Sequence, residues 1–245
     1  MNDSKLLILV NKVTNRLLYT FNYVLTNRLG ASFELTSDKD AFIGSQNDAK
    51  LNYSSHKVDG VLHVIPSSIL YEKKIYEVDL GIELENKLPL LFANGTLSLR
   101  HDVFGAVFYM LSRYQEYLPN RYDEHGRFSS AQSVLARYDA LQIAVVDRYI
   151  NRFAIWLNEH VKTLSLAPRK EQGSKLITLD VDQLYMFKSK GLARTCLAAI
   201  KDLLVNRKQL SKRLNVIIGK DQDQIDIYDE LIEKCKEKNI PSVLF

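Results

Sequence analysis

The stretch Lys175-Leu-Ile-Thr-Leu-Asp-Val-Asp182 is a short apolar run that ends in two carboxylates separated by one residue. Successive side chains of a strand point to opposite faces. One face would therefore carry Leu176, Thr178, Asp180 and Asp182, and the other Ile177, Leu179 and Val181. An apolar face for covering helices, opposite a face that turns acidic along its length, predicts a strand of an α/β sheet or barrel. In such folds the active sites lie beyond the carboxyl ends of the strands.

Two chemical interpretations of this acidic pair stay open on spacing alone. Like-facing residues two apart lie about 6 to 7 Å from each other at the Cα level, so one carboxylate can hold a metal while the other faces the metal-bound water. The plainer alternative is a junction between strand and loop, where aspartates cap backbone donors in tight turns. Spacing alone favours the plainer alternative, because Asp-x-Asp is a short and common pattern.

A family resemblance changes this balance. Thr178-Leu-Asp-Val-Asp182, followed by Tyr185 and by Lys188-Ser-Lys-Gly191, resembles the first motif of the polysaccharide deacetylases, also called carbohydrate esterase family four. The resemblance is to a bacterial branch that has an amino-terminal accessory domain. It implies a distorted (β/α) barrel that hydrolyses N- or O-acetyl groups on a carbohydrate. By position it also implies that Asp180 is the catalytic general base and that Asp182 is a ligand of a divalent metal, usually zinc.

The chain departs from the family pattern in two ways. Its two acids are separated by one residue, whereas adjacent acids are the commoner form, and no histidine follows Asp182 to supply the family's His-x-x-x-His motif. The later Arg motif and the final His motif are missing as well. Because a catalytic zinc needs about three protein ligands, we expect this chain neither to bind zinc stably nor to be active alone. Residues 239–245 look like the start of another strand, so we expect an incomplete barrel.

The five histidines do not supply the missing ligands by any sequence pattern. None forms the helical pair or the short loop spacing that is typical of zinc sites. We expect each of them to be an ordinary surface or core residue: His56, His63, His101, His125 and His160.

Length and composition allow two domains. The chain has 245 residues, of which 46% are hydrophobic and 25% charged, so it has enough apolar material for a core. Residues 165–174 are polar, contain Pro168 and Gly173, and are typical of a linker. We predict an amino-terminal α/β accessory domain over residues 1–165 and the start of a deacetylase-like (β/α) barrel over residues 175–245.

Hydrophobic periodicity predicts the individual elements. Strands are expected at 6–10, 32–36, 51–54, 61–65, 76–80, 175–182 and 214–218. One helix is expected at 13–29 and should end at Gly30. A second should begin after an N-cap at Asp102 and continue to residue 118. Further helices are expected at 145–161, 192–204 and 225–235, the last with Asp223 as its N-cap. In the second domain strand and helix alternate, as a (β/α) barrel requires.

Charge and cysteine usage limit the other classes of function. Cys196 and Cys235 look like reduced core residues, and the apolar run 6–10 is too short for a signal peptide or a membrane span, so we expect a cytoplasmic protein. A net charge of +4 does not by itself indicate nucleic-acid binding. The basic run from Lys188 to Arg213 is either a solvated helix face or an attraction for an anionic partner.

Three functions are therefore kept open. The first is a metal-dependent carbohydrate deacetylase, and its main competitor is a non-catalytic scaffold that binds a glycan or a protein partner. A protein that uses the basic run to bind nucleic acid or a membrane surface ranks third, because aromatic residues hardly accompany that run. The oligomeric state is left open.

Overall fold

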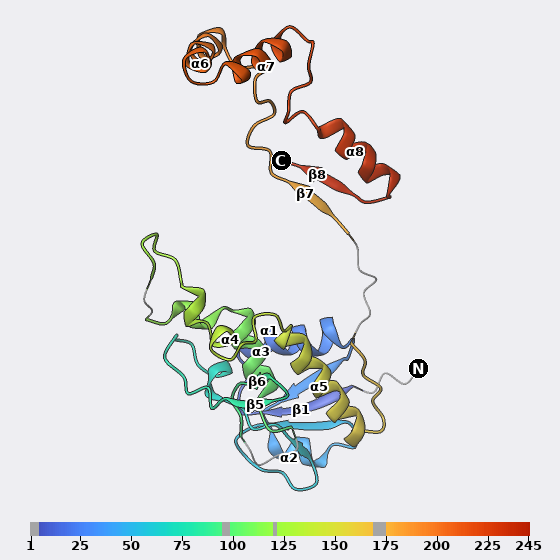
Figure 1. Cartoon of the computed structure of the whole chain (residues 1–245). Helices are drawn as coiled ribbons and strands as arrows, with labels where there is room; N and C mark the ends of the chain where they lie inside the picture. The colour runs from blue at the N-terminus through green and yellow to red at the C-terminus, as the bar shows by residue number, and fades with distance from the viewer. Residues whose placement is uncertain (1–4, 95–98, 120–121, 169–174) are drawn as a thin grey trace. The chain divides into compact units, whose positions relative to one another are not determined.

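The computed structural model describes residues 5–94, 99–119, 122–168 and 175–245 (Figure 1). The chain divides into two compact units, Met1–Lys170 and Glu171–Phe245. It is mixed α/β with a parallel sheet, as the sequence predicts. Each described helix is too short or too polar to cross a membrane.

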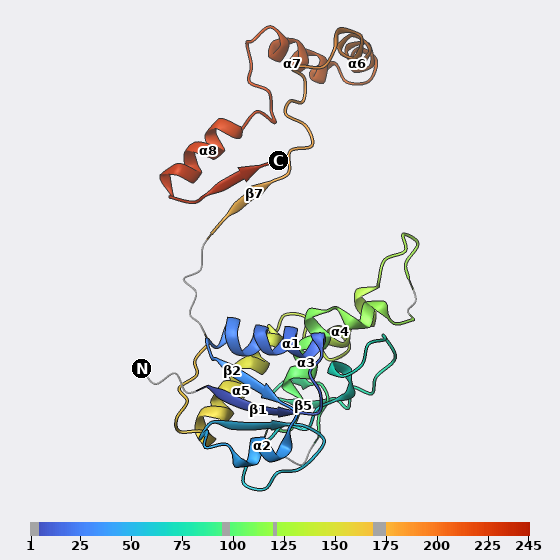
Figure 2. The same ribbon diagram turned by 180° about the vertical axis from the view of Figure 1, so that it is seen from behind.

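The amino-terminal unit is built on a four-stranded parallel sheet in the order β2-β1-β3-β4 (Figure 2). Its strands are β1 (Leu6–Val10), β2 (Phe33–Thr36), β3 (Lys50–Tyr53) and β4 (Leu62–His63). Central strand β1 is apolar and buried at all five positions, because helices cover both faces of the sheet. In its register, Ile8 lies opposite Leu35 on one side and Leu51 on the other.

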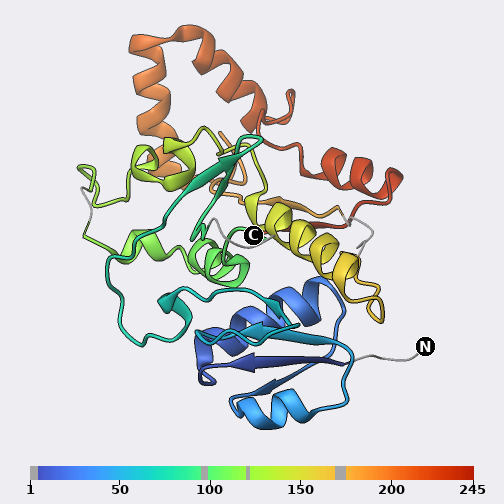
Figure 3. The same ribbon diagram turned by 90° about the horizontal axis from the view of Figure 1, so that it is seen from below.

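The helices divide between the two faces of the sheet (Figure 3). Helix α2 (Lys39–Gly44) covers one face, where its Phe42 packs with Leu7 and Leu9 of β1. The opposite face carries the larger core, which includes residues of α1 (Asn15–Phe21), its π-helical continuation η1 (Asn22–Arg28), α3 (Val103–Leu111) and α5 (Val145–His160). Four rings join these elements in consecutive contacts of 4.2 to 5.3 Å between ring centroids: Phe21, Tyr53, Phe104 and Phe153.

The remaining elements of this unit are short. They are an antiparallel hairpin of β5 (Glu83–Glu85) and β6 (Leu88–Leu90), helix α4 (Val134–Arg137), and the 3₁₀ turns η2 (Ser68–Leu70), η3 (Tyr114–Tyr117) and η4 (Ser130–Gln132). The hairpin turn places Asn86 and Lys87 at φ of 50° and 67°. Two successive positive φ values are typical of a type I′ turn, whose twist matches that of the flanking strands.

Asp102 links the start of α3 to the sheet. Its side chain is buried, and its Oδ1 accepts hydrogen bonds from the N–H groups of Phe104 (3.1 Å) and Gly105 (3.0 Å). Its Oδ2 accepts from the Tyr53 hydroxyl (3.0 Å) and from both the N–H (2.8 Å) and the hydroxyl (2.7 Å) of Ser67. A Cβ at position 105 would collide with the Ser67 hydroxyl and the Asp102 carboxylate, which explains the glycine there. Burial raises the pKa of Asp102, against the opposing effect of these donors.

The carboxy-terminal unit consists of two parallel strands joined by three helices. Strand β7 (Ile177–Leu179) pairs with β8 (Ser242–Leu244), and between them lie α6 (Leu192–Val205), α7 (Arg207–Ile217) and α8 (Tyr228–Glu237). Two further backbone bonds continue the ladder, from Val181 N–H to Phe245 O (3.1 Å) and from Phe245 N–H to Leu179 O (2.9 Å). The unit is therefore a parallel pair of strands with a helical crossover.

Three predictions about secondary structure are wrong. Residues 214–218 end helix α7 and are not a strand, since the Asn206 side chain accepts from Gln209 N–H and starts a helix that continues to Ile217. Residues 76–80 form no regular strand. The helix after Asp102 ends at Leu111, because Arg113 adopts a left-handed φ of 53° and the chain then forms η3.

Two short elements were not predicted, and one cysteine was expected in the wrong environment. Helix α2 and the β5–β6 hairpin are too short to show a clear periodicity in the sequence. Cys235 is buried as expected, whereas Cys196 is exposed on α6 and is not a core residue.

Replacing Asp102 by alanine should destabilise the amino-terminal unit by about 3 kcal/mol, because buried N–H and O–H donors lose their acceptor. Asp38 is the matched control, since it caps α2 in the same way through Ala41 N–H but is exposed. Asp38→Ala should cost only about 1 kcal/mol. Urea unfolding measures both, followed by the fluorescence of Trp156, the single tryptophan. Equal losses in the two variants would show that the buried network adds nothing to ordinary capping.

Candidate functional site

Asp180 and Asp182 follow directly after β7, at the carboxyl end of the strand. Both are exposed, together with Leu176 and Thr178, whereas the residues between them are half-buried: Ile177, Leu179 and Val181. This alternation agrees with the prediction that the two acids share one face of an extended segment. Within the described part of the chain, neither carboxylate forms a hydrogen bond or an ion pair. They therefore do not cap described backbone donors, which the plainer interpretation of the sequence requires.

The loop after the acids is held by Asp223. This carboxylate is 2% exposed and accepts from the N–H groups of Met186 (2.8 Å), Phe187 (2.7 Å) and Lys188 (3.1 Å). Burial by itself would raise the pKa of Asp223, but the donated N–H groups outweigh it and hold the pKa below its ordinary value. The sequence pattern predicts Asp223 as the N-cap of the last helix. That assignment is wrong, since α8 begins at Tyr228 without a side-chain cap.

A buried ion pair between Arg213 and Asp202 also contacts this loop. Arg213 Nε lies 2.7 Å from an Asp202 carboxylate oxygen, and the Arg213 guanidinium lies 4.8 Å from the centre of the Phe187 ring. All three side chains are buried. Asp223 and Arg213 together hold Phe187, five residues after Asp182, in a single arrangement.

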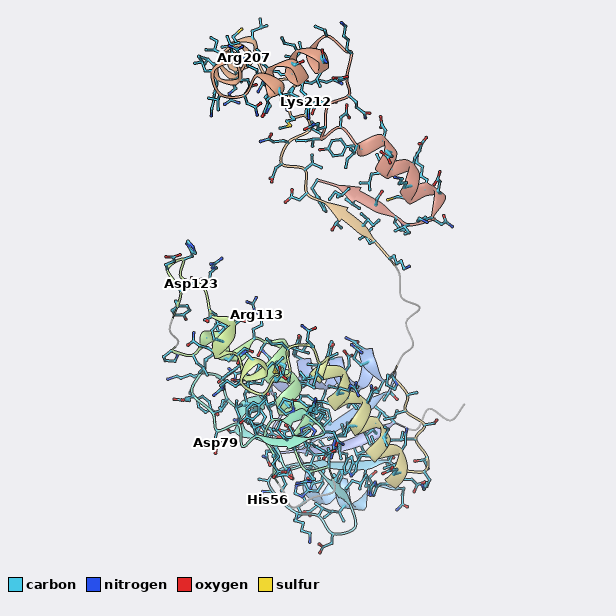
Figure 4. All side chains as sticks on the ribbon, in the orientation of Figure 1. His56, Asp79, Arg113, Asp123, Arg207 and Lys212 are labelled. Atoms are coloured by element: carbon cyan, nitrogen blue, oxygen red, sulfur yellow. The ribbon has the colours of Figure 1, made fainter. Side chains whose placement is uncertain are left out.

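The predicted basic run is therefore not one open surface. Arg213 is buried in the ion pair, and Lys188 faces Asp226 at 3.6 Å. The remaining cations of the run are exposed, and Figure 4 labels two of them, Arg207 and Lys212. Their exposure agrees with a solvated helix face.

The donors of this chain do not form a closed zinc site. Within residues 5–94, 99–119, 122–168 and 175–245, no three side chains of the His, Cys, Asp or Glu type gather as a metal ion requires. Asp182 alone supplies one of the roughly three ligands that a catalytic zinc needs. The assignments of Asp180 as a base and of Asp182 as a metal ligand stay predictions.

In the amino-terminal unit, polar residues gather at the carboxyl ends of the parallel strands. Asn11 follows β1 and Ser55 follows β3, and Asn11 Oδ1 accepts from both the N–H and the hydroxyl of Ser55 at 3.0 Å. Together with Ser37 and Lys39 they line a cavity of about 300 Å³. In the order β2-β1-β3-β4 this is the point where the chain changes direction across the sheet, where open α/β folds bind ligands. Sequence reasoning missed it, because strand order is not visible in local patterns.

His101 is the second feature that the sequence did not reveal. Its ring is fully buried and lies 5.1 Å from the Tyr149 ring between centroids. Burial, with a contribution from Arg152, lowers the pKa of His101 to about 4, so the imidazole is neutral at pH 7. The backbone of Leu91 acts in the opposite direction on this pKa, although no hydrogen bond of ordinary geometry joins either ring nitrogen to a described residue. His101 is thus a core residue, as expected.

Comparison with known proteins identifies the amino-terminal unit. The sequence model of a family described as a family of unknown function (DUF7033) matches residues 6–162, well over half of the chain. The chain belongs to this family. No curated protein and no solved structure matches it. The DUF7033 region includes β1 to α5, and therefore the switch-point cavity and His101, whereas both acids lie after it.

The DUF7033 region should lose stability as the pH falls, and His101 should account for part of the loss. Its pKa is about 6.5 when unfolded and about 4 when folded, so below pH 6.5 the unfolded state binds more protons. The neutral imidazole of His101 contributes about 3 kcal/mol to the free energy of unfolding. This contribution is complete at neutral pH and is lost as the pH falls from about 6.5 to 4.

His101→Phe removes this titration and should flatten the dependence of unfolding free energy on pH between about 7 and 5. His125 is exposed, so His125→Phe serves as the control and should leave the dependence unchanged. Urea unfolding at each pH measures the slope. An unchanged slope in the His101 variant would rule out the buried imidazole as its source.

Asp223→Ala should release the loop after the acids. Three backbone N–H groups lose their acceptor, so amide hydrogen exchange in residues 183–190 should accelerate about tenfold or more. Asp226→Ala is the control, because it removes only the 3.6 Å contact with the Lys188 ammonium. Mass spectrometry of peptides from this segment measures both variants. If they exchange at the same rate, Asp223 does not hold the loop.

Proposed function

We propose that this protein is polysaccharide deacetylase-like and serves the hydrolysis of N- or O-acetyl groups on a carbohydrate. The carboxy-terminal unit would be the first part of a distorted (β/α) barrel, and the DUF7033 region its accessory domain. The supporting observation is the pair Asp180 and Asp182, which lies exposed and without described partners at the carboxyl end of a parallel strand. This is where catalytic groups of α/β sheets and barrels are found.

The exposed apolar surface of the carboxy-terminal unit supports a larger sheet. Among the side chains that the structure describes in this unit, the buried apolar ones are few: Phe187, Val216 and Cys235. Many large apolar side chains are exposed in the same unit, among them Leu176, Leu192, Leu197, Ile200, Leu204, Val205 and Phe245. Two strands alone are marginally stable, and parallel sheets normally have both faces covered. We infer that further polypeptide covers these faces in the working protein.

The proposal gives the two acids different roles, proton acceptor for Asp180 and metal ligand for Asp182. Asp180 is suited to accept a proton, since no described group occupies its carboxylate and water reaches it. Asp182 would contribute one ligand to a divalent metal. Because the described donors do not complete a zinc site, the proposal requires further ligands beyond the described residues. A cytoplasmic location and a carbohydrate substrate belong to the same proposal.

A second candidate is a scaffold that binds a glycan or a protein partner without catalysis. It is favoured by the lack of a metal-binding group among the described residues and by the large share of the chain that the DUF7033 region occupies. Under this alternative, substitution of either acid leaves the biological activity intact.

Acetate release by the complete product of the gene tests the proposal. With acetylated chitooligosaccharide or acetylated xylan as substrate, we expect release that depends on a divalent metal. Asp180→Asn should lower kcat about 100-fold or more with unchanged metal content, because the proton acceptor is lost. Asp182→Asn should lower the metal content. Asp221→Asn, at an exposed aspartate of the same unit, is the control and should behave as the unsubstituted protein.

Two results would contradict the proposal. One is a complete gene product that carries no stoichiometric metal and releases no acetate from either substrate. The other is full activity in Asp180→Asn. Either result would leave the non-catalytic scaffold as the better account of the chain.

A further inference from the structure

A second cavity of the DUF7033 region lies between α5 and the β5–β6 hairpin. Its volume is about 560 Å³, within the range of small-molecule sites. Arg148, Asn151 and Glu159 lie along the exposed face of α5, at spacings that place them on one side of the helix. Arg152 and Glu85 form an ion pair that joins α5 to the hairpin. The cavity is thus lined by polar side chains from two separate elements.

One buried polar atom without a described partner, Arg152 Nε, belongs to the wall of this cavity. Among the described residues, the buried side-chain nitrogens and oxygens without a hydrogen-bond partner are Arg152 Nε, both ring nitrogens of His101, and Asn94 Oδ1. Arg152 lines the cavity and lies close enough to His101 to lower its pKa. His101 is bridged to Ala93, the neighbour of Asn94. Because buried polar groups are nearly always paired, the unpaired Nε of Arg152 in the cavity wall indicates that another molecule provides its missing partner.

The charges of the lining balance. Arg148 and Arg152 are cationic, and Glu85 and Glu159 are anionic. A phosphate or carboxylate ligand would meet two carboxylates as well as two guanidinium groups. A neutral ligand with both hydrogen-bond donors and acceptors can pair with all four groups, since guanidinium only donates and carboxylate only accepts.

The remaining wall is apolar. Leu88, Ile143, Ile155 and Trp156 line the cavity beside the polar groups. Sugars combine these two requirements, because a pyranose ring has C–H faces that pack on apolar and aromatic side chains and hydroxyl groups around its edge.

We propose that the cavity between α5 and the β5–β6 hairpin is a binding site for a neutral oligosaccharide. Arg148 and Asn151 donate to its hydroxyl oxygens, Glu159 accepts from its hydroxyl groups, and one inserted hydroxyl pairs with Arg152 Nε. The site itself is independent of any chemistry at Asp180. Only the choice of acetylated amino sugars as the first probe rests on the proposed function.

Trp156 reports on occupation of the site, because it lines the cavity and is the only tryptophan of the chain. The test titrates the full chain with chitotetraose, the tetramer of N-acetylglucosamine, and with cellotetraose, and follows tryptophan fluorescence and the heat of binding. We expect a saturable change with at least one of these neutral probes. Tetragalacturonate, an acidic oligosaccharide, should bind at least tenfold more weakly.

Substitutions locate the site. Arg148→Ala and Asn151→Ala alter exposed side chains and should fold normally, and each should weaken binding about tenfold, as expected for the loss of one or two polar contacts. Arg207→Ala removes an exposed arginine of the carboxy-terminal unit and should leave the affinity unchanged. Asp180→Asn should also bind as the unsubstituted chain, which separates failure of this site from failure of the deacetylase proposal.

Three outcomes would overturn the inference. The first is no saturable signal with either neutral tetramer up to about 10 mM, where even weak sugar sites are occupied. The second is tighter binding of tetragalacturonate than of the neutral probes, which would show that the site prefers anionic ligands. The third is equal weakening by Arg148→Ala and Arg207→Ala, which would place the binding elsewhere.

Discussion

The buried carboxylate of Asp102 is the interaction on which the amino-terminal unit depends. One side chain caps α3, binds the tyrosine hydroxyl at the end of β3 and holds the N–H and hydroxyl of Ser67. A buried acid is costly unless each oxygen is well supplied with donors, and here the two oxygens accept five hydrogen bonds. Helix, strand and loop can therefore adopt only the arrangement in which these donors converge. The ring cluster around Phe104 then packs against a helix whose position is already set.

The carboxy-terminal unit uses the same device. Asp223 collects three consecutive N–H groups of a loop, and the neighbouring pair of Arg213 and Asp202 packs on the phenyl ring in that loop. Buried polar contacts of this kind define one conformation where apolar packing is sparse, and few of the apolar side chains described in this unit are buried. The loop they hold follows Asp182 directly. A well-defined loop beside two exposed acids is what a precise site requires, since side chains with fixed supports keep their geometry.

The two units contribute different kinds of evidence about function. The DUF7033 family description carries no activity, so the chemistry has to be argued from the sites themselves. In the carboxy-terminal unit the acids are exposed and have no partner among the described residues, which suits groups that act on a substrate rather than on the fold. In the amino-terminal unit the Nε of Arg152 is buried without a described hydrogen-bond partner and belongs to a cavity with balanced charge, which suits recognition rather than proton transfer. Catalysis and binding are thus proposed for separate parts of the chain.

The sequence by itself determined the elements with long or strongly patterned signals. It predicted β1, a helix over 13–29 that the structure forms as α1 and η1, α5, α6, the N-cap at Asp102 and the two acids on one face after β7, because periodicity and capping act over a few residues. Residues 214–218 misled it, since a short apolar run suits a strand and a helix end equally well, and here Leu214, Ile217 and Ile218 are exposed. Only the tertiary structure decided the strand order, the role of Asp223 and the meeting of His101 with Arg152. Each of these depends on partners far apart in the chain, and long-range pairing leaves no periodic trace in a single sequence.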